Sequence, residues 1–285
     1  MRLCRYNADR LGLVKGDQAI DVTMALEPIP HVRWPRPPGD AMIANLEAVR
    51  EIVVANQQWG YVQPVDKVKL LSPVANPTKI IGAPANYRDH VAEAAADAAI
   101  NLGRKIGTID EYGLFLKANS ALAGAGEGIV LGRTDRRNDH EVELAMIVGR
   151  IAKNVAYDEA LDHVAGYSIG LDITVRGVED RSLRKSLDSY AVLGPWMTTA
   201  DEIENPDDLN FRISVNGEVR QESNTRHQIF DCRKLIEYAS KFYTLYPGDV
   251  IMTGTPRGVG PLEPGDRLEC AVDVIGRMSV EVREG

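Results

Sequence analysis

Two glutamates in the segment 140–149 have the spacing of metal ligands. Glu141 and Glu143 stand two residues apart, and the residues that follow, Leu144 to Val148, are apolar enough to be core. In an extended strand, side chains two apart point to the same face, so the pattern predicts two adjacent, half-buried carboxylates. Such a pair repels, and one member would take up a proton unless a cation neutralised both.

A third acid, Asp172, lies between Leu171 and Ile173, in a similarly apolar setting. An unpaired carboxylate there would be unfavourable. Three carboxylates from two apolar strands favour a hard cation, Mg²⁺ first, with Mn²⁺ or Ca²⁺ as alternatives. Zinc or non-haem iron would normally require His or Cys ligands, and none stands at a suitable spacing. Surface strands also carry Glu-x-Glu pairs without any ion, so the residues alone leave both interpretations open.

His90 and Glu93 are candidates for proton transfer. They stand three residues apart in a predicted helix, so both occupy one helical face. A carboxylate beside an imidazole orients the ring and raises its basicity, which suits a general base acting on water. An exposed His–Glu pair on a surface helix is the simpler interpretation of these two residues alone.

The segment Thr253–Gly260 reads Thr-Gly-Thr-Pro-Arg-Gly-Val-Gly and follows an apolar strand. Its glycines permit close backbone approach, and its hydroxyls and amides could bind an anionic group. It matches neither a phosphate-binding Walker loop nor a dinucleotide fingerprint. A purely structural turn is the alternative.

The elements that position these residues form two predicted units. Residues 1–75 are expected to form a small N-terminal α/β domain, with a hairpin over residues 11–22 and, after a Pro-rich stretch, a helix capped by Asp40 and carrying Met42, Leu46, Val49 and Val53 on one face. Residues 76–285 are expected to form the catalytic domain.

Short β-branched strands dominate this second unit. Asn216-Gly217 predicts a tight hairpin turn, and Asp231 is expected to cap a helix with Leu235, Ile236, Ala239 and Phe242 on one face. Strict βαβ alternation is missing, so a β-rich α+β fold with a mixed sheet is favoured over a Rossmann or TIM fold.

Charge and composition narrow the class of protein. The 285 residues carry a net charge of −8, with a pI near 5.3, and show no basic face for nucleic acid. Two basic clusters, at Arg133/Arg136/Arg137 and at Arg181/Arg184/Lys185, are interleaved with acids; they are expected to be solvated, although single members could hold a substrate carboxylate. Three widely spaced cysteines and the lack of a long apolar run predict a cytoplasmic protein without a membrane partner.

Several motifs in a fixed order resemble the fumarylacetoacetate hydrolase superfamily, in the branch of acylpyruvate hydrolases, oxaloacetate decarboxylases and 2-hydroxyhepta-2,4-diene-1,7-dioate isomerases. The match runs from about Lys79 to Val282. The motifs are Asn86-Tyr-Arg-Asp-His90, Leu114-Phe-Leu-Lys117, Glu141-Val-Glu143, Gly166-Tyr to Asp172, Lys185-Ser-Leu-Asp188, Leu193-Gly-Pro-Trp196, Val215 to Gln221, and Pro247-Gly-Asp to Gly260.

The resemblance implies a role for each matching residue. It implies that Glu141, Glu143 and Asp172 bind the metal, that His90 and Glu93 activate water on a lid helix, and that Lys185 stabilises oxyanion charge. It also implies substrate contacts from Tyr87, Arg176 and Thr255. A mixed β-sheet roll, a smaller N-terminal domain, Mg²⁺ dependence, a role in aromatic compound catabolism and a homodimer are implied as well.

The chain departs from the family pattern near the expected mouth of the site. Gly177 stands where an Asp commonly follows the arginine, Leu187 replaces a usual Phe, and residues 97–113 resemble an insertion after the lid helix. Such changes affect the identity of the substrate, not the chemistry.

The predicted reaction is hydrolysis of a C–C bond in a 1,3-dicarbonyl, acylpyruvate-like acid. His90, held by Glu93, would activate water for attack on the distal carbonyl, and the departing carbon would leave as an enolate stabilised by the metal and Lys185. The alternatives at the same site are isomerisation or tautomerisation of a 2-hydroxy-dienedioate and decarboxylation of an oxaloacetate-like acid. A purely structural ion is a third interpretation.

Overall fold

A computed structural model describes all residues, 1–285, and its centre is a large mixed sheet. Most neighbouring strands are antiparallel, whereas β17 and β6, and likewise β14 and β8, run parallel. In spatial order the strands are β4 (Val62–Pro64), β3 (Gln18–Asp21), β2 (Arg10–Lys15), β1 (Arg2–Tyr6), β14 (Ala191–Thr199), β12 (Val164–Asp172), β11 (Val142–Val148), β17 (Val250–Met252), β6 (Ile80–Gly82) and β7 (Phe115–Lys117), with β5 (Leu70–Leu71) paired to β1 and β8 (Leu122–Gly124) paired to β14.

Two smaller sheets complete the β structure. One has the order β16 (Glu218–Asn224), β15 (Asn210–Val215), β19 (Arg267–Val272), β20 (Gly276–Glu284) and β9 (Ile129–Leu131). The other has the order β13 (Thr174–Val175), β10 (Asn138–His140) and β18 (Gly260–Pro261). The predicted β-rich α+β class with a mixed sheet is confirmed.

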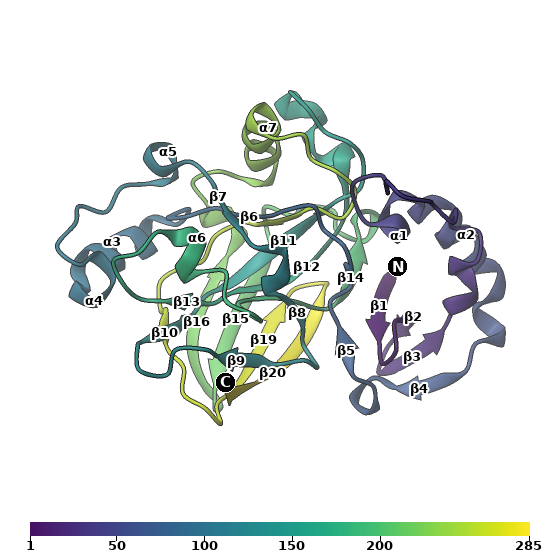
Figure 1. Cartoon of the computed structure of the whole chain (residues 1–285), viewed down its shortest axis with the longest axis horizontal. Helices are drawn as coiled ribbons and strands as arrows, with labels where there is room; N and C mark the ends of the chain where they lie inside the picture. Colours follow the sequence, from purple (N-terminus) through teal and green to yellow (C-terminus); the bar gives the residue numbers. More distant parts are fainter.

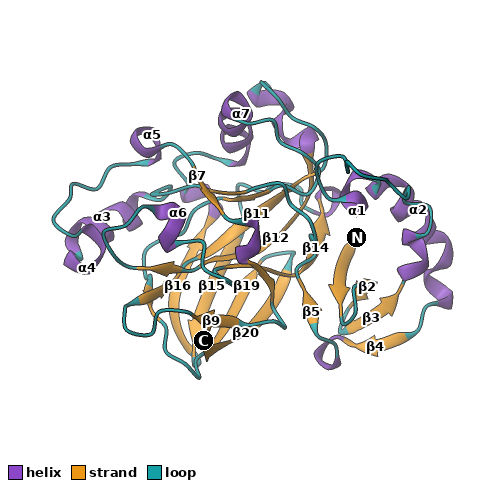
Figure 2. Cartoon of the chain, in the orientation of Figure 1, coloured by secondary structure: helices purple, strands orange, loops and turns teal.

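Short helices lie around the sheets rather than between them (Figure 2). Figure 1 shows α1 (Ala41–Ala44) and α2 (Leu46–Asn56) beside β1–β4 at one end of the molecule, and α3 (Arg88–Ala96), α4 (Ala98–Asn101) and α6 (Arg181–Arg184) at the other. The helices α5 (Ile109–Tyr112) and α7 (Cys232–Phe242) lie along the upper side in this view. No helix is long and apolar enough to cross a membrane.

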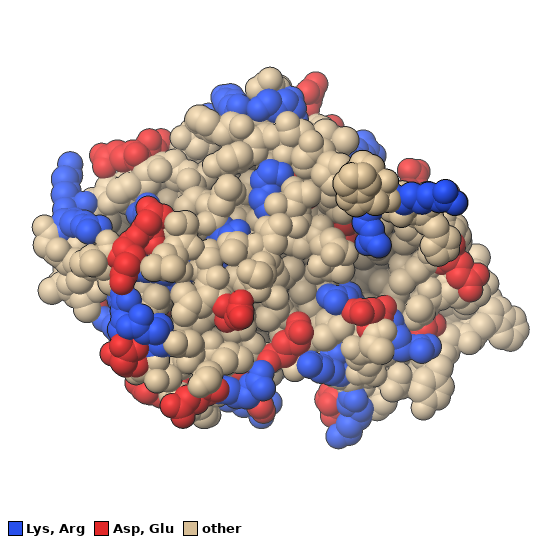
Figure 3. All heavy atoms as spheres, in the orientation of Figure 1, with Lys and Arg blue, Asp and Glu red and all other residues tan.

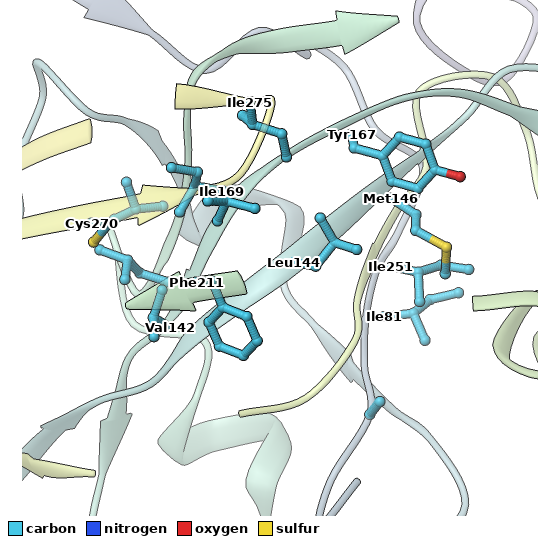
Figure 4. Packing of buried hydrophobic residues seen from close by; sticks show 14 of the residues in the cluster. Ile81, Val142, Leu144, Met146, Tyr167, Ile169, Phe211, Ile251, Cys270 and Ile275 are labelled. Carbon is cyan, nitrogen blue, oxygen red and sulfur yellow. The ribbon is translucent and has the colours of Figure 1, made fainter. Parts of the chain in front are cut away.

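The main core lies between the large sheet and the five-stranded sheet (Figure 4). Alternate residues of β11, Val142, Leu144 and Met146, enter this core together with Tyr167 and Ile169 of β12. Burial of apolar side chains between two sheets is the main stabilising contribution in such an arrangement. The residues between them on β11, Ala145 and Ile147, face a second core that is shared with the N-terminal strands. Both faces of β11 are therefore buried.

The N-terminal strands continue the large sheet, because β1 pairs antiparallel with β14. The predicted hairpin over residues 11–22 is present as β2 and β3, with Lys15 opposite Gln18. The side chain of Asp40 accepts hydrogen bonds from the amides of Met42 (3.0 Å) and Ile43 (3.1 Å), as expected of a helix cap. Whether residues 1–75 form a domain of their own stays a prediction.

Two helices differ from the expected outline. The helix after Asp40 is divided at Asn45 into α1 and α2. Asp231 caps α7 as predicted, but Phe242 does not share the buried face of that helix: it is 62% exposed and its ring packs on Tyr238 at the surface. Phe242 is the last residue of α7, so no following turn covers it. The Asn216-Gly217 hairpin is confirmed, with both residues at positive φ.

Candidate active site

The ends of β11 and β12 bring three carboxylates together. Val142 pairs with Leu171, and the amide of Asp172 donates to the carbonyl oxygen of Glu141 at 2.9 Å, so Glu141 and Asp172 are neighbours across the two strands. Glu143, two residues after Glu141, lies on the same face. Carboxylate oxygens of all three side chains lie within 4.8 Å of one another, and all three residues are buried.

Three cations surround two of these carboxylates. Lys185 Nζ lies 2.8 Å from Glu141 Oε2 and 2.6 Å from Asp172 Oδ2. Lys117 Nζ, fully buried, contacts the other oxygen of Asp172. Arg176 Nη2 lies 3.2 Å from Glu141 Oε1. Buried charges persist when they are paired in this way.

Glu143 has no such cation and accepts a hydrogen bond only from the amide of Gly254, at 2.7 Å. Burial and the neighbouring charges of Asp172 and Glu141 raise the pKa of Glu143 well above its ordinary value. Burial acts in the same direction on Glu141, but Lys185 and Arg176 outweigh it and hold the pKa of Glu141 below its ordinary value. The cluster thus has one carboxylate whose charge is uncompensated. A divalent cation among the three would compensate it, and an all-oxygen donor set fits Mg²⁺ or Mn²⁺.

The loop after β17 closes one side of this cluster. Thr253 donates its hydroxyl to the carbonyl oxygen of Leu144 (2.9 Å), and Thr255 donates to that of Val142 (2.9 Å). Gly254, with φ of +97°, passes so close to Asn86 that a Cβ atom would lie 2.7 Å from the Asn86 Cβ. The loop is therefore fixed along the edge of β11, with the Gly254 amide directed at Glu143.

His90 and Glu93 lie on α3 and contact each other, but they do not form an exposed surface pair. His90 is 9% exposed, and its Nδ1 lies 3.1 Å from Glu93 Oε2. The other oxygen, Glu93 Oε1, accepts from the amide of Gly258 at 2.7 Å. Burial tends to raise the pKa of Glu93, but the bonds from His90 and Gly258 outweigh it and lower it. Gly258 belongs to the same loop as Gly254, whose amide binds Glu143, so this loop joins α3 to the carboxylate cluster.

The three predicted substrate contacts lie in different surroundings. Arg176 is held by Asp139 (2.7 Å) as well as by Glu141. Thr255 is buried, and its hydroxyl also accepts a hydrogen bond from Gln221 (2.8 Å). Tyr87 is buried in the main core beside Phe211. Their roles toward substrate, like those of His90, Glu93 and Lys185, stay predictions.

Three residues of the site received no role from sequence reasoning. Lys117 is the last residue of the Leu114–Lys117 motif, and it contacts Asp172. Asp139 is fully buried between Arg137 and Arg176, and Arg137 also reaches Asp97 at the end of α3 (3.0 Å). Gln221 joins the Thr255 loop to the amide of Val142 (3.1 Å). Lys117 ends a short apolar run, which is a local signal for burial, whereas Asp139 and Gln221 stand in polar strands and carry no local signal of their buried contacts.

Comparison with known proteins places this site in a family. Residues 79–283 match the family described as "Fumarylacetoacetate (FAA) hydrolase C-terminal". The chain belongs to the fumarylacetoacetate hydrolase family. The family predicted from the motifs and the enzymatic class that goes with it are therefore confirmed.

Three proteins of this family illustrate its range. The chain is 52% identical to a maleylpyruvate hydrolase of Aquipseudomonas alcaligenes over 285 residues, covering 99% of each chain. A crystal structure of the maleylpyruvate hydrolase of Sphingobium sp. SYK-6 in complex with manganese(II) ion and pyruvate is 38% identical and has a TM-score of 0.83, with 100% of both chains covered. A 2-hydroxyhepta-2,4-diene-1,7-dioate isomerase of Mycobacterium marinum is 28% identical, with a TM-score of 0.69 over 100% of this chain and 98% of that one.

Proposed function

We propose that this chain is a metal-dependent hydrolase that cleaves a C–C bond in a 1,3-dicarbonyl acid of the acylpyruvate type. The observation that carries the proposal is the buried His90–Glu93 pair, which the loop after β17 joins to the carboxylate cluster, because an imidazole held by a carboxylate can act as a base toward water. The identity to a maleylpyruvate hydrolase over the whole chain supports the same reaction.

Glu141, Glu143 and Asp172 would hold the divalent ion, Mn²⁺ or Mg²⁺. The Mn²⁺ in the Sphingobium enzyme supports Mn²⁺, and the set of three carboxylates is compatible with either ion. When bound, the ion supplies Lewis-acid polarisation of the keto-acid oxygens of the substrate.

Each side chain of the site has a separate role in the proposed reaction. Glu93 accepts from His90 Nδ1, which leaves Nε2 to take the proton of a water molecule. Hydroxide attacks the distal carbonyl, the C–C bond breaks to give a carboxylic acid, and the departing carbon leaves as an enolate that takes up a proton to become pyruvate. Lys185, with its ammonium at the cluster, stabilises the enolate oxygen. Arg176, Thr255 and Tyr87 are the proposed contacts to the substrate.

The test uses the purified protein, Mn²⁺ and acetylpyruvate, followed by loss of the enol absorbance. We expect turnover, abolition by EDTA with recovery on added Mn²⁺, and a loss of at least 100-fold in kcat for His90→Ala. Activity that persisted with EDTA and in His90→Ala would contradict the proposal.

The second candidate is isomerisation or tautomerisation at the same centre, which the similarity to the Mycobacterium marinum isomerase favours. The two reactions differ in the product. Hydrolysis in H₂¹⁸O places ¹⁸O in the released carboxylic acid, whereas isomerisation or decarboxylation releases no acid labelled in this way.

We also propose that the enzyme acts as a homodimer in the cytoplasm, in the catabolism of aromatic compounds. Three buried, unpaired cysteines are compatible with a reducing compartment. The proposal of a homodimer rests on the family resemblance. The molar mass of the protein, measured by light scattering as it elutes from a size-exclusion column, tests it directly.

A further inference from the structure

A cleft of about 530 Å³ opens between the segment that follows α3, residues 100–112, and the loop that leads into α6. The segment contributes Arg104 and Lys105 to its wall, and α6 contributes Arg181 and Arg184. Figure 1 shows α4 and α6 at the same end of the molecule, beside α3. Basic and acidic side chains alternate over this end, so the surface by itself is not a basic patch (Figure 3).

Inside the cleft, however, the basic side chains lack acidic partners. None of the four forms an ion pair: Arg181 lies over the ring of Tyr112 at 4.5 Å, and Arg104 reaches only the carbonyl oxygen of Val178, at 3.4 Å.

The two acids that line the cleft are bound elsewhere. Glu179 accepts two hydrogen bonds from Arg136, each of 2.9 Å, and Asp180 accepts from the amide of Ser182 (2.8 Å) as the cap of α6. The cleft therefore has an excess of positive charge available to a ligand.

Of the four basic residues that line the cleft, Arg184 is the one best placed to bind an anion. It is partly buried, and its guanidinium donates to the carbonyl oxygens of Glu179 (2.8 Å) and Val175 (3.4 Å), which leaves Nη2 without a partner. Burial, together with the like charges of Arg176 and Arg181, lowers its pKa. The free Nη2 group of Arg184 is therefore available to an anionic ligand.

The cleft adjoins the active site. Arg184 immediately precedes Lys185, whose ammonium contacts Glu141 and Asp172. It also donates to the carbonyl oxygen of Val175, the residue before Arg176, which contacts Glu141. One wall of the cleft and the carboxylate cluster thus share these two segments of the chain.

Gly177 shapes the wall of the cleft that faces the segment 100–112. A Cβ atom at Gly177 would lie 1.5 Å from Arg136 Nη2. The glycine therefore lets Arg136 cross the loop and bind both carboxylate oxygens of Glu179, so Glu179 forms its ion pair with Arg136 and not with Arg184.

We propose that the cleft binds the distal carboxylate of a dicarboxylic acylpyruvate, and that Arg184 is the residue that selects for it. The planar guanidinium can bind a carboxylate with two hydrogen bonds, and Lys105 and Arg181 add attraction from the opposite and adjacent walls. The inference rests on the proposed function, since it assumes that the keto-acid end of the substrate occupies the metal centre.

The experiment compares two substrates with the full-length Mn²⁺ enzyme: maleylpyruvate, which has a second carboxylate, and acetylpyruvate, which does not. The quantity measured is the ratio of kcat/KM for maleylpyruvate to kcat/KM for acetylpyruvate. We expect Arg184→Gln to lower this ratio by about 10- to 100-fold, the value of a hydrogen-bonded charge pair. Arg184→Lys should lower it less, because it keeps the charge and loses the fork.

Further variants distinguish a loss of substrate selectivity from a loss of folding. Arg184 also supports the α6 loop, so Lys105→Gln and Arg181→Gln test the cleft without removing those backbone bonds; each is expected to lower the ratio severalfold. Arg50→Gln, which removes an arginine on α2 paired with Asp201 at the opposite end of the molecule, is the matched control and should leave the ratio unchanged.

The outcomes are distinct. An unchanged ratio in folded Arg184→Gln, Lys105→Gln and Arg181→Gln would overturn the inference while turnover of either substrate still supported the proposed function. If the wild type turned over neither substrate, the proposed function itself would fail. Inhibition by maleate that competed with neither substrate, and that Arg184→Gln relieved, would identify a separate anion site and would also overturn the inference.

Discussion

The contact between Glu93 and two hydrogen-bond donors gives a sharp test of the catalytic arrangement. Glu93 accepts from His90 Nδ1 at one oxygen (3.1 Å) and from the Gly258 amide at the other (2.7 Å). A glutamine at this position has one oxygen and one NH₂ group, so it cannot accept both bonds. Because the Gly258 amide can only donate, Glu93→Gln would direct its oxygen at Gly258 and its NH₂ at His90.

His90 would then have to accept at Nδ1 and carry its proton on Nε2, the nitrogen that is proposed to take a proton from water. The loss is one hydrogen bond to a charged group, about 1.5–3 kcal/mol. We therefore expect kcat/KM for acetylpyruvate to fall by roughly 10- to 100-fold, less than the loss in His90→Ala. Since Glu93 is partly exposed, with 24% of its side chain accessible, the free energy of unfolding should change by only about 1 kcal/mol.

Steady-state kinetics with Mn²⁺ measures the first effect, and thermal unfolding measures the second. Glu47→Gln is the control, because Glu47 is exposed on α2 and forms no ion pair. If folded Glu93→Gln kept wild-type kcat/KM within about twofold, Glu93 would not set the protonation of His90, and the scheme for water activation would be wrong.

Three further results are expected. Gly258→Ala should lower the free energy of unfolding by about 1–3 kcal/mol in denaturant titration, and should lower activity too, because Gly258 has φ of +98° and a Cβ atom there would lie 2.0 Å from the Arg220 carbonyl oxygen. Chelation with EDTA should abolish activity but leave the circular dichroism spectrum unchanged, because cations already pair two of the three carboxylates; unfolding on chelation would instead favour a structural ion. Burial tends to raise the pKa of Asp21, but Arg10 and the other hydrogen-bond donors lower it to about 2. The free energy of unfolding of the wild type should therefore exceed that of Asp21→Asn by about 1 kcal/mol at neutral pH. This difference should disappear as the pH falls from about 4 to 2, and a difference that persisted at the acid end would contradict the assignment.

Local sequence patterns determined the parts of this protein that depend on neighbours along the chain. The two-residue repeat placed Glu141 and Glu143 on one face of a strand, and the register with β12 then brought Asp172 beside them. Asp40 and Asp231 marked helix starts because their carboxylates can accept from amides two or three residues on. Such features need no knowledge of distant segments.

Partners from distant segments were decided by the tertiary structure. Nothing local indicates that Lys117 contacts Asp172, that Gly258 holds Glu93, or that Glu143 has no cation. The end of α7 illustrates the same limit, since Phe242 has helical spacing but no covering element.

The physical reason is that burial and pairing depend on which strands become neighbours. Sheet pairing joins residues far apart in the sequence, whereas side-chain periodicity extends over only a few residues. The sequence by itself therefore determined the family and marked three candidate metal ligands, while the tertiary structure decided which charges are compensated and opened the cleft at Arg184, where we expect the substrate to be selected.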